Sequence, residues 1–329
     1  MGVRVTPYLD TISSVPIKND IGVEREPDIV FNGSHYVVVW SEGDFGGMHK
    51  VRAARVTTQG AVLDSGILFG KDSYLEYHPS VSFGDGHCLA VWYAYDEPYG
   101  VFGRFLNDQA QPIGDAFEIT LSQTNHYYTP DIAYADGRYL IVWNEQTSYA
   151  GDEVFGQIVD TSGTLINDVI PIAVGPGYQS MQRVTGDNMF LTVWSQNGDI
   201  YGQRISTDGQ LLGSNFKISD PVSGDRSSPD IAIGSENCLA VWMQYNINSY
   251  DIFGNLDTPT FIHESREPHA CKIYSGPTII AGSLQQFMNK GNTIIYDISG
   301  RRIQHEPVSP GVYFVVDENQ TKVKIIKIR

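Results

Sequence analysis

The chain has 329 residues, and 41% of them are apolar, which is enough for a sizeable hydrophobic core. Charged residues make up only 18%, while 33 glycines and 19 tyrosines are typical of a turn-rich β protein. No window approaches the roughly 18 consecutive apolar residues that a membrane-spanning helix needs. We therefore expect no membrane span.

The net charge of −16 is unevenly distributed along the chain. Residues 262–329 hold 9 Lys or Arg and 6 Asp or Glu, whereas residues 1–261 hold 13 and 32. This acidic body argues against a nucleic-acid partner, because contact with phosphates needs a basic face. The simplest interpretation of the acidity is solubility.

Five segments that end in tryptophan repeat along the chain. The tryptophans are spaced by 52, 51, 51 and 48 residues, and they are Trp40, Trp92, Trp143, Trp194 and Trp242. A Pro-Asp or Pro-Ser opening precedes four of them, at Pro27, Pro79, Pro130 and Pro229. Turn pairs such as Asn32-Gly33 and Asp85-Gly86 lie between opening and tryptophan, and such pairs join two strands in a hairpin. The pattern predicts the first two strands of a repeated unit.

A third motif follows each of the last four tryptophans after a polar loop. It reads VFGRF from Val101, VFGQIVD from Val154, IYGQRIS from Ile200 and IFGNLD from Ile252. A further turn and a short apolar run, such as AFEIT at 116–120, predict a fourth strand. Four short strands per unit at a period near 50 residues describe one propeller blade. The sequence therefore predicts an all-β, five-bladed β-propeller with four-stranded blades over residues 1–261.

The two ends of this region complement each other. The fifth copy stops after Asp257 without a fourth strand, and the first twenty residues resemble the end of a repeat. Residues 15–18 are therefore expected to form the fourth strand of the last blade, which closes the ring and removes two open sheet edges. An open array of blades is the alternative.

The repeated residues of the strands have a structural interpretation. The tryptophans, and the glycine after the aromatic residue of the third strand, are expected to pack between blades. Cys88 and Cys238 occupy the same position in two repeats, which is too far apart for a disulfide. With Cys271 they predict three free, mostly buried thiols.

Residues 268–329 leave the repeat after a linker at 262–267, and their strand and turn signals predict a small β-sandwich. Three motifs follow in order: IYDISGRR at 295–302, PGVYF at 310–314 and KIIKIR at 324–329. This region resembles the type A C-terminal sorting domain of the type IX secretion system. The resemblance implies export across the outer membrane of a Bacteroidetes-like bacterium, attachment to surface polysaccharide, and the secretion machinery as a partner. An accessory β domain packed on the propeller is the alternative.

The first residues, MGVRVTPYLD, lack the charged and apolar segments of a signal peptide. Because the tail implies export, we expect that a leader has been removed and that the protein is secreted or anchored at the cell surface. A cytosolic protein is the alternative. The repeat also resembles the blades of large secreted bacterial proteins.

No established catalytic motif is present, and the cysteines and histidines show no metal-ligand spacing. The sequence therefore predicts no catalytic residue, metal site or cofactor. Carboxylates of the loops between second and third strands include Asp44, Asp152, Asp199 and Asp251. The last three recur at nearly the same place, which indicates a turn or cap role.

Aromatic residues gather in the loops that share one face of a propeller. Variable loops on a repeated scaffold carry function, and tyrosines suit the stacking of sugars or the anchoring of a protein. The candidate ligand-binding residues are Tyr77, His78, His126, Tyr127, Tyr128, Tyr178, Tyr93, Tyr95 and Tyr245. The alternative is that these side chains only cover the tops of the blades.

The sequence thus favours a non-catalytic surface module, not an enzyme, that recognises an extracellular glycan or protein through these loops. One alternative is a structural or self-associating surface component. Another is an enzyme acting on extracellular polysaccharide, which needs two or three carboxylates converging on the centre of the ring.

Overall fold

A computed structural model of the chain describes the blades almost completely and the C-terminal region in part. The described residues are 2–5, 11–18, 22–44, 47–71, 75–96, 99–122, 129–148, 151–175, 177–219, 224–234, 237–246, 249–257, 278–280, 294–297, 302–303, 311–316 and 322–327. The chain forms two compact units, Met1–Thr192 with Gln203–Ser214, and Val193–Gly202 with Asn215–Arg329. Each is considered by itself below.

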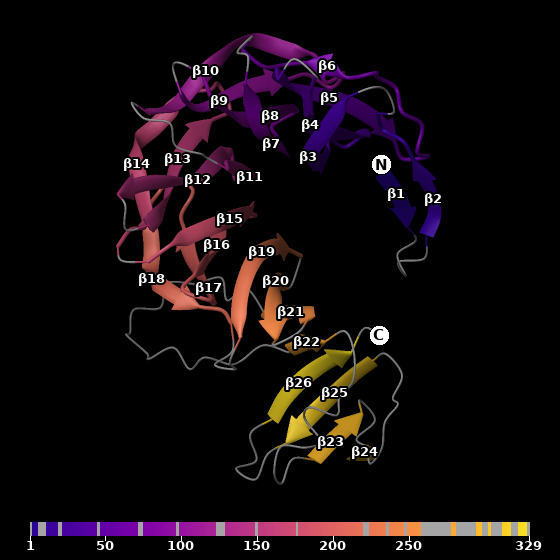
Figure 1. Cartoon of the computed structure of the whole chain (residues 1–329), viewed down its shortest axis with the longest axis vertical. Helices are drawn as coiled ribbons and strands as arrows, with labels where there is room; N and C mark the ends of the chain where they lie inside the picture. Colours follow the sequence, from indigo (N-terminus) through magenta and orange to yellow (C-terminus); the bar gives the residue numbers. More distant parts are fainter. Residues whose placement is uncertain are drawn as a thin grey trace. The chain divides into compact units, whose positions relative to one another are not determined.

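The fold is a five-bladed β-propeller with four-stranded antiparallel blades, and the predicted fold class is confirmed (Figure 1). Each of the first four blades is a meander of strands in chain order. These strands are β3 (Val23–Phe31), β4 (His35–Gly43), β5 (His49–Thr57) and β6 (Ile67–Leu68); β7 (Glu76–Gly84), β8 (His87–Ala94), β9 (Tyr99–Leu106) and β10 (Pro112–Ser122); β11 (Asp131–Ala135), β12 (Arg138–Ser148), β13 (Gly151–Asp160) and β14 (Leu165–Ala173); and β15 (Gln179–Gly186), β16 (Phe190–Gln196), β17 (Asp199–Ile205) and β18 (Leu211–Lys217).

The fifth blade takes its fourth strand from the C-terminal region. Its strands β19 (Asp225–Ile233), β20 (Cys238–Asn246) and β21 (Ser249–Asp257) are followed at the edge by β22 (Thr278–Ile280). We expected residues 15–18 at this edge. Instead β1 (Gly2–Val5) and β2 (Thr11–Val15) pair with each other. The short apolar, β-branched β22 satisfies the free hydrogen-bonding groups of β21 that the N-terminal segment was expected to satisfy.

The sheet of the fifth blade continues into the last strands of the chain. These are β23 (Ile294–Asp297), β24 (Arg302–Ile303), β25 (Gly311–Val316) and β26 (Lys322–Lys327). β26 runs parallel to β22, and β25 pairs antiparallel with both β26 and β23. Most of the residues on which the predicted sandwich depends lie outside the described part of the chain.

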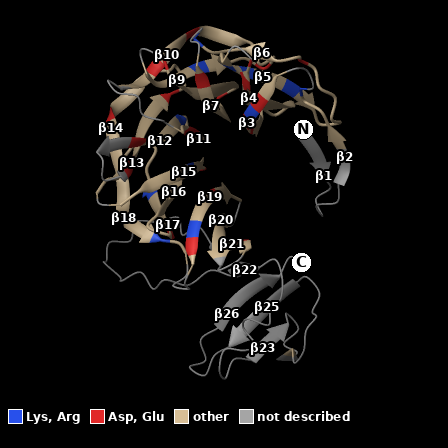
Figure 2. Ribbon diagram, in the orientation of Figure 1, with Lys and Arg blue, Asp and Glu red and all other residues tan. Residues whose placement is uncertain are grey.

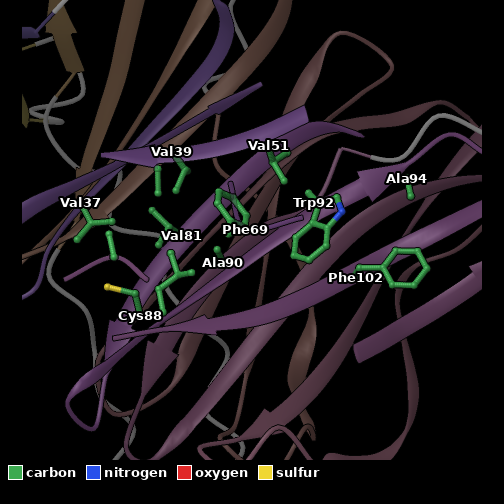
Figure 3. Packing of buried hydrophobic residues seen from close by; sticks show 13 residues of the cluster. Val37, Val39, Val51, Phe69, Val81, Cys88, Ala90, Trp92, Ala94 and Phe102 are labelled. Carbon is green, nitrogen blue, oxygen red and sulfur yellow. The ribbon is translucent and has the colours of Figure 1, made fainter. Parts of the chain in front are cut away.

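The hydrophobic core of the first unit lies between neighbouring blades. Val37, Val39 and Phe69 of the first blade pack against Ala90 and Trp92 of the second (Figure 3). A second cluster joins the second blade to the third through residues such as Tyr93 and Trp143. All five tryptophans are at most 4% exposed. The expectation that they pack between blades is confirmed for Trp92 and Trp143. Trp92, Trp143 and Trp194 also stack on the aromatic residue opposite them in the third strand of their own blade.

Glycines of the third strands make room for this packing. A Cβ on Gly103 would meet Phe117 Cζ at 2.9 Å, and one on Gly156 would meet Ile172 Cδ1 at 2.8 Å. The missing side chain therefore lets a fourth-strand residue lie directly over the third strand. The close approach of a ring is confirmed at Gly103, but the approaching residues belong to the same blade rather than to its neighbour, as had been expected.

Two of the three cysteines fall in the described part of the chain, and both are free. Cys88 is buried and Cys238 half-buried, while Cys271 lies outside the described residues. Burial raises the pKa of the Cys88 thiol to about 12, which keeps it protonated and unreactive. Within the described residues, no helix is long and apolar enough to cross a membrane.

Candidate active site

The first strands of successive blades lie beside one another in the first unit. β3 contacts β7, β7 contacts β11, and β11 contacts β15. We call these four the inner strands. Residues at the same position of successive repeats therefore become neighbours in space, although about fifty residues separate them in the chain.

The inner strands carry a repeated bulge at the Pro-Asp or Pro-Ser opening. The register of β3 shifts between Arg25 and Asp28, and that of β7 between Tyr77 and Ser80. At each bulge the residue before proline has a positive φ, 55° at Glu26 and 51° at His78. Proline disfavours the right-handed helical region for the residue before it, and a bulge re-aims side chains. Each bulge thus contains a local conformation that is uncommon for non-glycine residues, and Met181 of β15 adopts it, at 56°, without a following proline.

Two carboxylates meet beside these bulges through a serine. Ser80 Oγ lies 2.8 Å from Asp28 Oδ2 and 3.0 Å from Asp131 Oδ1. Two hydrogen-bond lengths place these oxygens within about 6 Å of each other. The three residues hold the second position of the opening in the first three blades, which is why they meet.

Backbone hydrogen bonds hold the two carboxylates in place. Val81 N donates to Asp28 Oδ2 at 2.8 Å, and Val184 N donates to Asp131 Oδ2 at 2.7 Å. Each aspartate therefore binds the backbone of the next inner strand. A serine hydroxyl carries one proton and can donate to only one of its two acidic neighbours at a time. The other contact is a hydrogen bond only when that carboxyl is itself protonated.

Asp131 is the carboxyl whose surroundings favour protonation. Burial of the carboxyl is the main cause that raises the pKa of Asp131 to about 6, and the negative charge of Asp28 adds to it. Arg183 and the hydrogen bonds from Val184 and Ser80 act in the opposite direction. The residue remains partly accessible to solvent. The Asp131 carboxyl therefore keeps its proton up to about pH 6.

A carboxylate–imidazole pair, Glu26 and His78, lies at the same two bulges. Glu26 Oε2 accepts hydrogen bonds from Ser41 Oγ at 3.0 Å and from His78 N at 2.8 Å, while Glu26 Oε1 lies 3.3 Å from His78 Nδ1. Burial is the main cause that lowers the pKa of His78. This pair fixes the side chains at the two bulges. The inner-strand cluster, as we name it, consists of Glu26, Asp28, His78, Ser80, Asp131 and Arg183.

The described tyrosines of the sequence-based candidate set are dispersed. Tyr77 lies beside the inner-strand cluster, its ring centroid 6.5 Å from that of His78. Tyr178 is 59% exposed before β15, and Tyr245 pairs with Tyr250 on the fifth blade. Tyr93 is fully buried in the core and presents no surface to a ligand.

The remaining candidates add little to the site. Tyr95 follows β8 and packs against the rings of Tyr93 and Tyr99. His126, Tyr127 and Tyr128 lie outside the described residues. Of the whole predicted set, the described structure therefore brings only His78 into the inner-strand cluster, through Glu26, with Tyr77 beside it.

Two of the loop carboxylates considered in the sequence have structural contacts. Asp44 Oδ1 accepts a hydrogen bond from Met48 N at 2.9 Å within its own turn. Asp199 pairs with Arg226 at 2.6 Å and with Lys217 at 2.7 Å. The carboxylates that meet instead come from the Pro-Asp openings, which sequence reasoning used only to mark the start of a strand. Their signal was the acid that follows the proline of the opening in the first, third and fifth repeats.

Comparisons with known proteins identify the fold but no family. No family model and no curated protein matches the chain. Among solved structures, a thermostable family-43 glycoside hydrolase is 12% identical, with a TM-score of 0.45, and the match covers 76% of this chain and 96% of that one. An α-L-arabinofuranosidase from Lactobacillus brevis is 12% identical, with a TM-score of 0.44, covering 88% and 95%. Zg3597, a family 117 glycoside hydrolase from the marine bacterium Zobellia galactanivorans, is 11% identical, with a TM-score of 0.46, covering 72% and 84%.

These matches correct the functional interpretation made from the sequence. The similar propellers are named as glycoside hydrolases. That finding contradicts the prediction of a non-catalytic binding module and the expectation that the chain is not an enzyme. At these identities the matches show the fold alone, so an activity has to be argued from the residues of this chain.

Proposed function

We propose that the chain is a hydrolase of extracellular polysaccharide, with Asp131 as general acid and Asp28 as its partner carboxylate. The observation that carries the proposal is the pair of carboxyls held together by Ser80, one of them with its pKa raised to about 6. Paired carboxyls about 5–9.5 Å apart are the usual machinery of glycoside cleavage. Their different surroundings assign the two roles.

The chemistry of cleavage follows from this assignment. Protonated Asp131 gives its proton to the glycosidic oxygen as the bond from that oxygen to the anomeric carbon breaks. Water adds to the anomeric carbon, and its proton passes to a carboxylate such as Asp28. The backbone donors Val81 and Val184 fix both carboxyl groups, so that little reorganisation is needed during the reaction.

The direct test is the release of reducing ends from a panel of plant and algal polysaccharides by the full chain between pH 4 and pH 8. We expect hydrolysis of at least one polymer, with activity that declines above about pH 6 as Asp131 loses its proton. No hydrolysis of any polymer would contradict the proposal.

Replacing Ser80 with alanine is expected to move the pH profile rather than abolish activity. The Ser80 hydrogen bond lowers the pKa of Asp131, so its loss in Ser80→Ala raises that pKa further. The basic limb of the rate profile should therefore shift to higher pH, which kcat/KM measured across pH will show. Ser82→Ala on the same strand is the control, and a basic limb that stays in place argues against Asp131 as the acid.

The C-terminal region supports a separate proposal about where the protein is located. We propose, from its sequence resemblance, that residues 268–329 direct export through a type IX secretion system. A fluorescent protein fused to these residues should reach the cell surface in a bacterium with that system and stay inside a mutant that lacks it. Removal of residues 322–329 from the fusion should leave it inside the wild-type cell. Retention of the complete fusion by wild-type cells is the contrary result.

A further inference from the structure

Arg183 departs from the charge pattern of the inner strands. The second position of the opening is Asp28 in the first blade, Ser80 in the second and Asp131 in the third. Counted back from the tryptophan, Gln182 holds this position in the fourth blade. The positive-φ residue of β15 is Met181, however, and Arg183 follows it by two residues, as Asp28 follows Glu26 and Ser80 follows His78. Figure 2 shows acidic and basic residues placed along the inner end of the blades, on strands such as β3. Arg183 therefore places a cation on the inner strand next to the one that carries Asp131, at the position equivalent to those of the two carboxylates.

The backbone on both sides of Arg183 is anchored. The Gln182 side chain is buried and donates from Nε2 to the carbonyl oxygen of Thr129. Val184 N donates to Asp131 Oδ2 at 2.7 Å. Arg183 itself is exposed between these two anchored residues. Its position next to the acid Asp131 is thus set by the fold rather than by its own side-chain contacts.

Most N–H donors of the Arg183 guanidinium make no hydrogen bond to the described residues. Nη1 donates to the adjacent carbonyl of Gln182 at 2.9 Å, and no carboxylate of the described residues lies within ion-pair distance. Three other arginines of this acidic chain form ion pairs among the described residues: Arg52 with Glu42 at 2.8 Å, Arg55 with Asp64 at 2.8 Å and Arg226 with Asp199 at 2.6 Å. An arginine presents five N–H donors in a planar fork that matches a carboxylate.

Arg183 supplies the positive charge of the inner-strand cluster. Burial is the main cause that lowers the pKa of His78; the negative charge of Glu26 opposes this effect and the positive charge of Arg183 adds to it. The Tyr77 ring lies beside the cluster, 6.5 Å from the ring of His78, and packs against the ring of His49 at 4.5 Å. The cluster itself thus combines an acid with a cation.

We propose that Arg183 makes this site selective for glycans that carry carboxylates, that is, for chains containing uronic acids. The inference rests on the proposed glycan hydrolysis and names its substrate class. The free edge of the guanidinium pairs with a sugar carboxylate while Asp131 faces the glycosidic oxygen. Within a body that is acidic overall, this fixed cation offsets the repulsion that an anionic chain would otherwise meet.

The test measures binding separately from cleavage. Full-length Asp28→Asn protein, which keeps both Asp131 and Arg183, is run in affinity gels against matched polymers. The pairs are polygalacturonate with its methyl ester and alginate with its carboxyl-reduced form, and a sulfated galactan forms a further arm. We expect at least one acidic polymer to bind about ten-fold more tightly than its neutral counterpart at low salt.

Two arginine variants assign this preference to a residue. Arg183→Gln should bring the acidic-to-neutral affinity ratio to within about two-fold of one. Arg138→Gln is the matched control, because Arg138 also donates only to its neighbouring carbonyl, Gly137 O, but lies at the opposite end of the β11–β12 hairpin. It should leave the ratio unchanged. The ratio is the appropriate readout because Arg183 also lowers the pKa of Asp131 and thereby affects cleavage of every substrate.

The outcomes separate this inference from the proposed function. Equal binding of acidic and neutral polymers, binding of none, preference for the sulfated galactan, or a ratio that survives Arg183→Gln overturns the inference. Acidic preference that depends on Arg183, without hydrolysis by the wild-type chain, supports the inference as a binding site and overturns the enzyme proposal. Hydrolysis of neutral polymers alone supports the enzyme and overturns the substrate class.

Discussion

Replacement of Asp131 with asparagine is expected to lower kcat for polysaccharide hydrolysis by about 10²- to 10⁴-fold, because an amide cannot deliver the proton that the leaving oxygen needs. The amide keeps nearly the same size, and its oxygen can still accept the hydrogen bond from Val184 N. A large loss of kcat with a small change of KM would therefore report the missing proton rather than a collapsed site. Steady-state assays on the substrate found in the polymer panel measure both values.

Asp168→Asn is the control for this experiment. Asp168 is exposed on β14 of the same blade, and its variant should keep full activity. An Asp131→Asn enzyme that retains wild-type kcat would rule out Asp131 as the acid.

The pH dependence of stability gives an independent check of the Asp131 proton. A carboxyl whose pKa is raised on folding binds its proton more tightly in the native state, so stability falls as pH rises from about 4 to about 6. The slope reaches about 1.4 kcal/mol per pH unit for one such group. Asp131→Asn should remove this contribution, and urea unfolding at several pH values will show the difference between the two slopes.

Replacement of Trp92 with alanine is expected to cost about 3–5 kcal/mol of unfolding free energy, the usual range for a buried tryptophan. The Trp92 ring is fully buried. It stacks on Phe102 of its own blade at 6.3 Å between centroids and meets the edge of Phe69 from the preceding blade at 5.6 Å. Its loss opens a cavity between the first two blades. Urea denaturation followed by circular dichroism measures the effect.

Two further variants show whether the loss of stability in Trp92→Ala is caused by the lost side-chain volume. The indole Nε1 of Trp92 has no hydrogen-bond partner among the described residues, so Trp92→Phe loses only packing and should cost less than Trp92→Ala. Tyr178→Ala, at a side chain that is 59% exposed, should change stability by no more than about 0.5 kcal/mol. Equal midpoints for Trp92→Ala and Tyr178→Ala would contradict the assigned role of Trp92 in the core.

The strands could be predicted because their signals are local. Turn pairs such as Asp85-Gly86, with φ of 50° and 81°, mark hairpins within a few residues. The tryptophan spacing then repeats the same unit five times. A period is visible in one sequence without any knowledge of which residues touch, and it was sufficient for the number of blades and the order of strands in the first four of them.

The role of individual aromatic residues was less predictable. Tyr93 and Tyr77 both looked like loop residues, but Tyr93 lies inside β8 and is buried, whereas Tyr77 lies on β7 beside the carboxylates. The side of a strand that faces the next blade depends on register, and a shift of one residue exchanges the two faces. Sequence composition alone does not carry that information.

The sequence by itself determined the all-β architecture, the five blades and their buried tryptophans, because these depend on short-range turns and on a repeated pattern. Only the tertiary structure decided which strand completes the fifth blade and which acids meet. Asp28 and Asp131 are 103 positions apart in the chain, and Ser80 connects them because neighbouring inner strands place one repeat position side by side. The raised pKa of Asp131 has the same origin, since burial between blades removes water from a carboxyl that the chain alone would leave solvated.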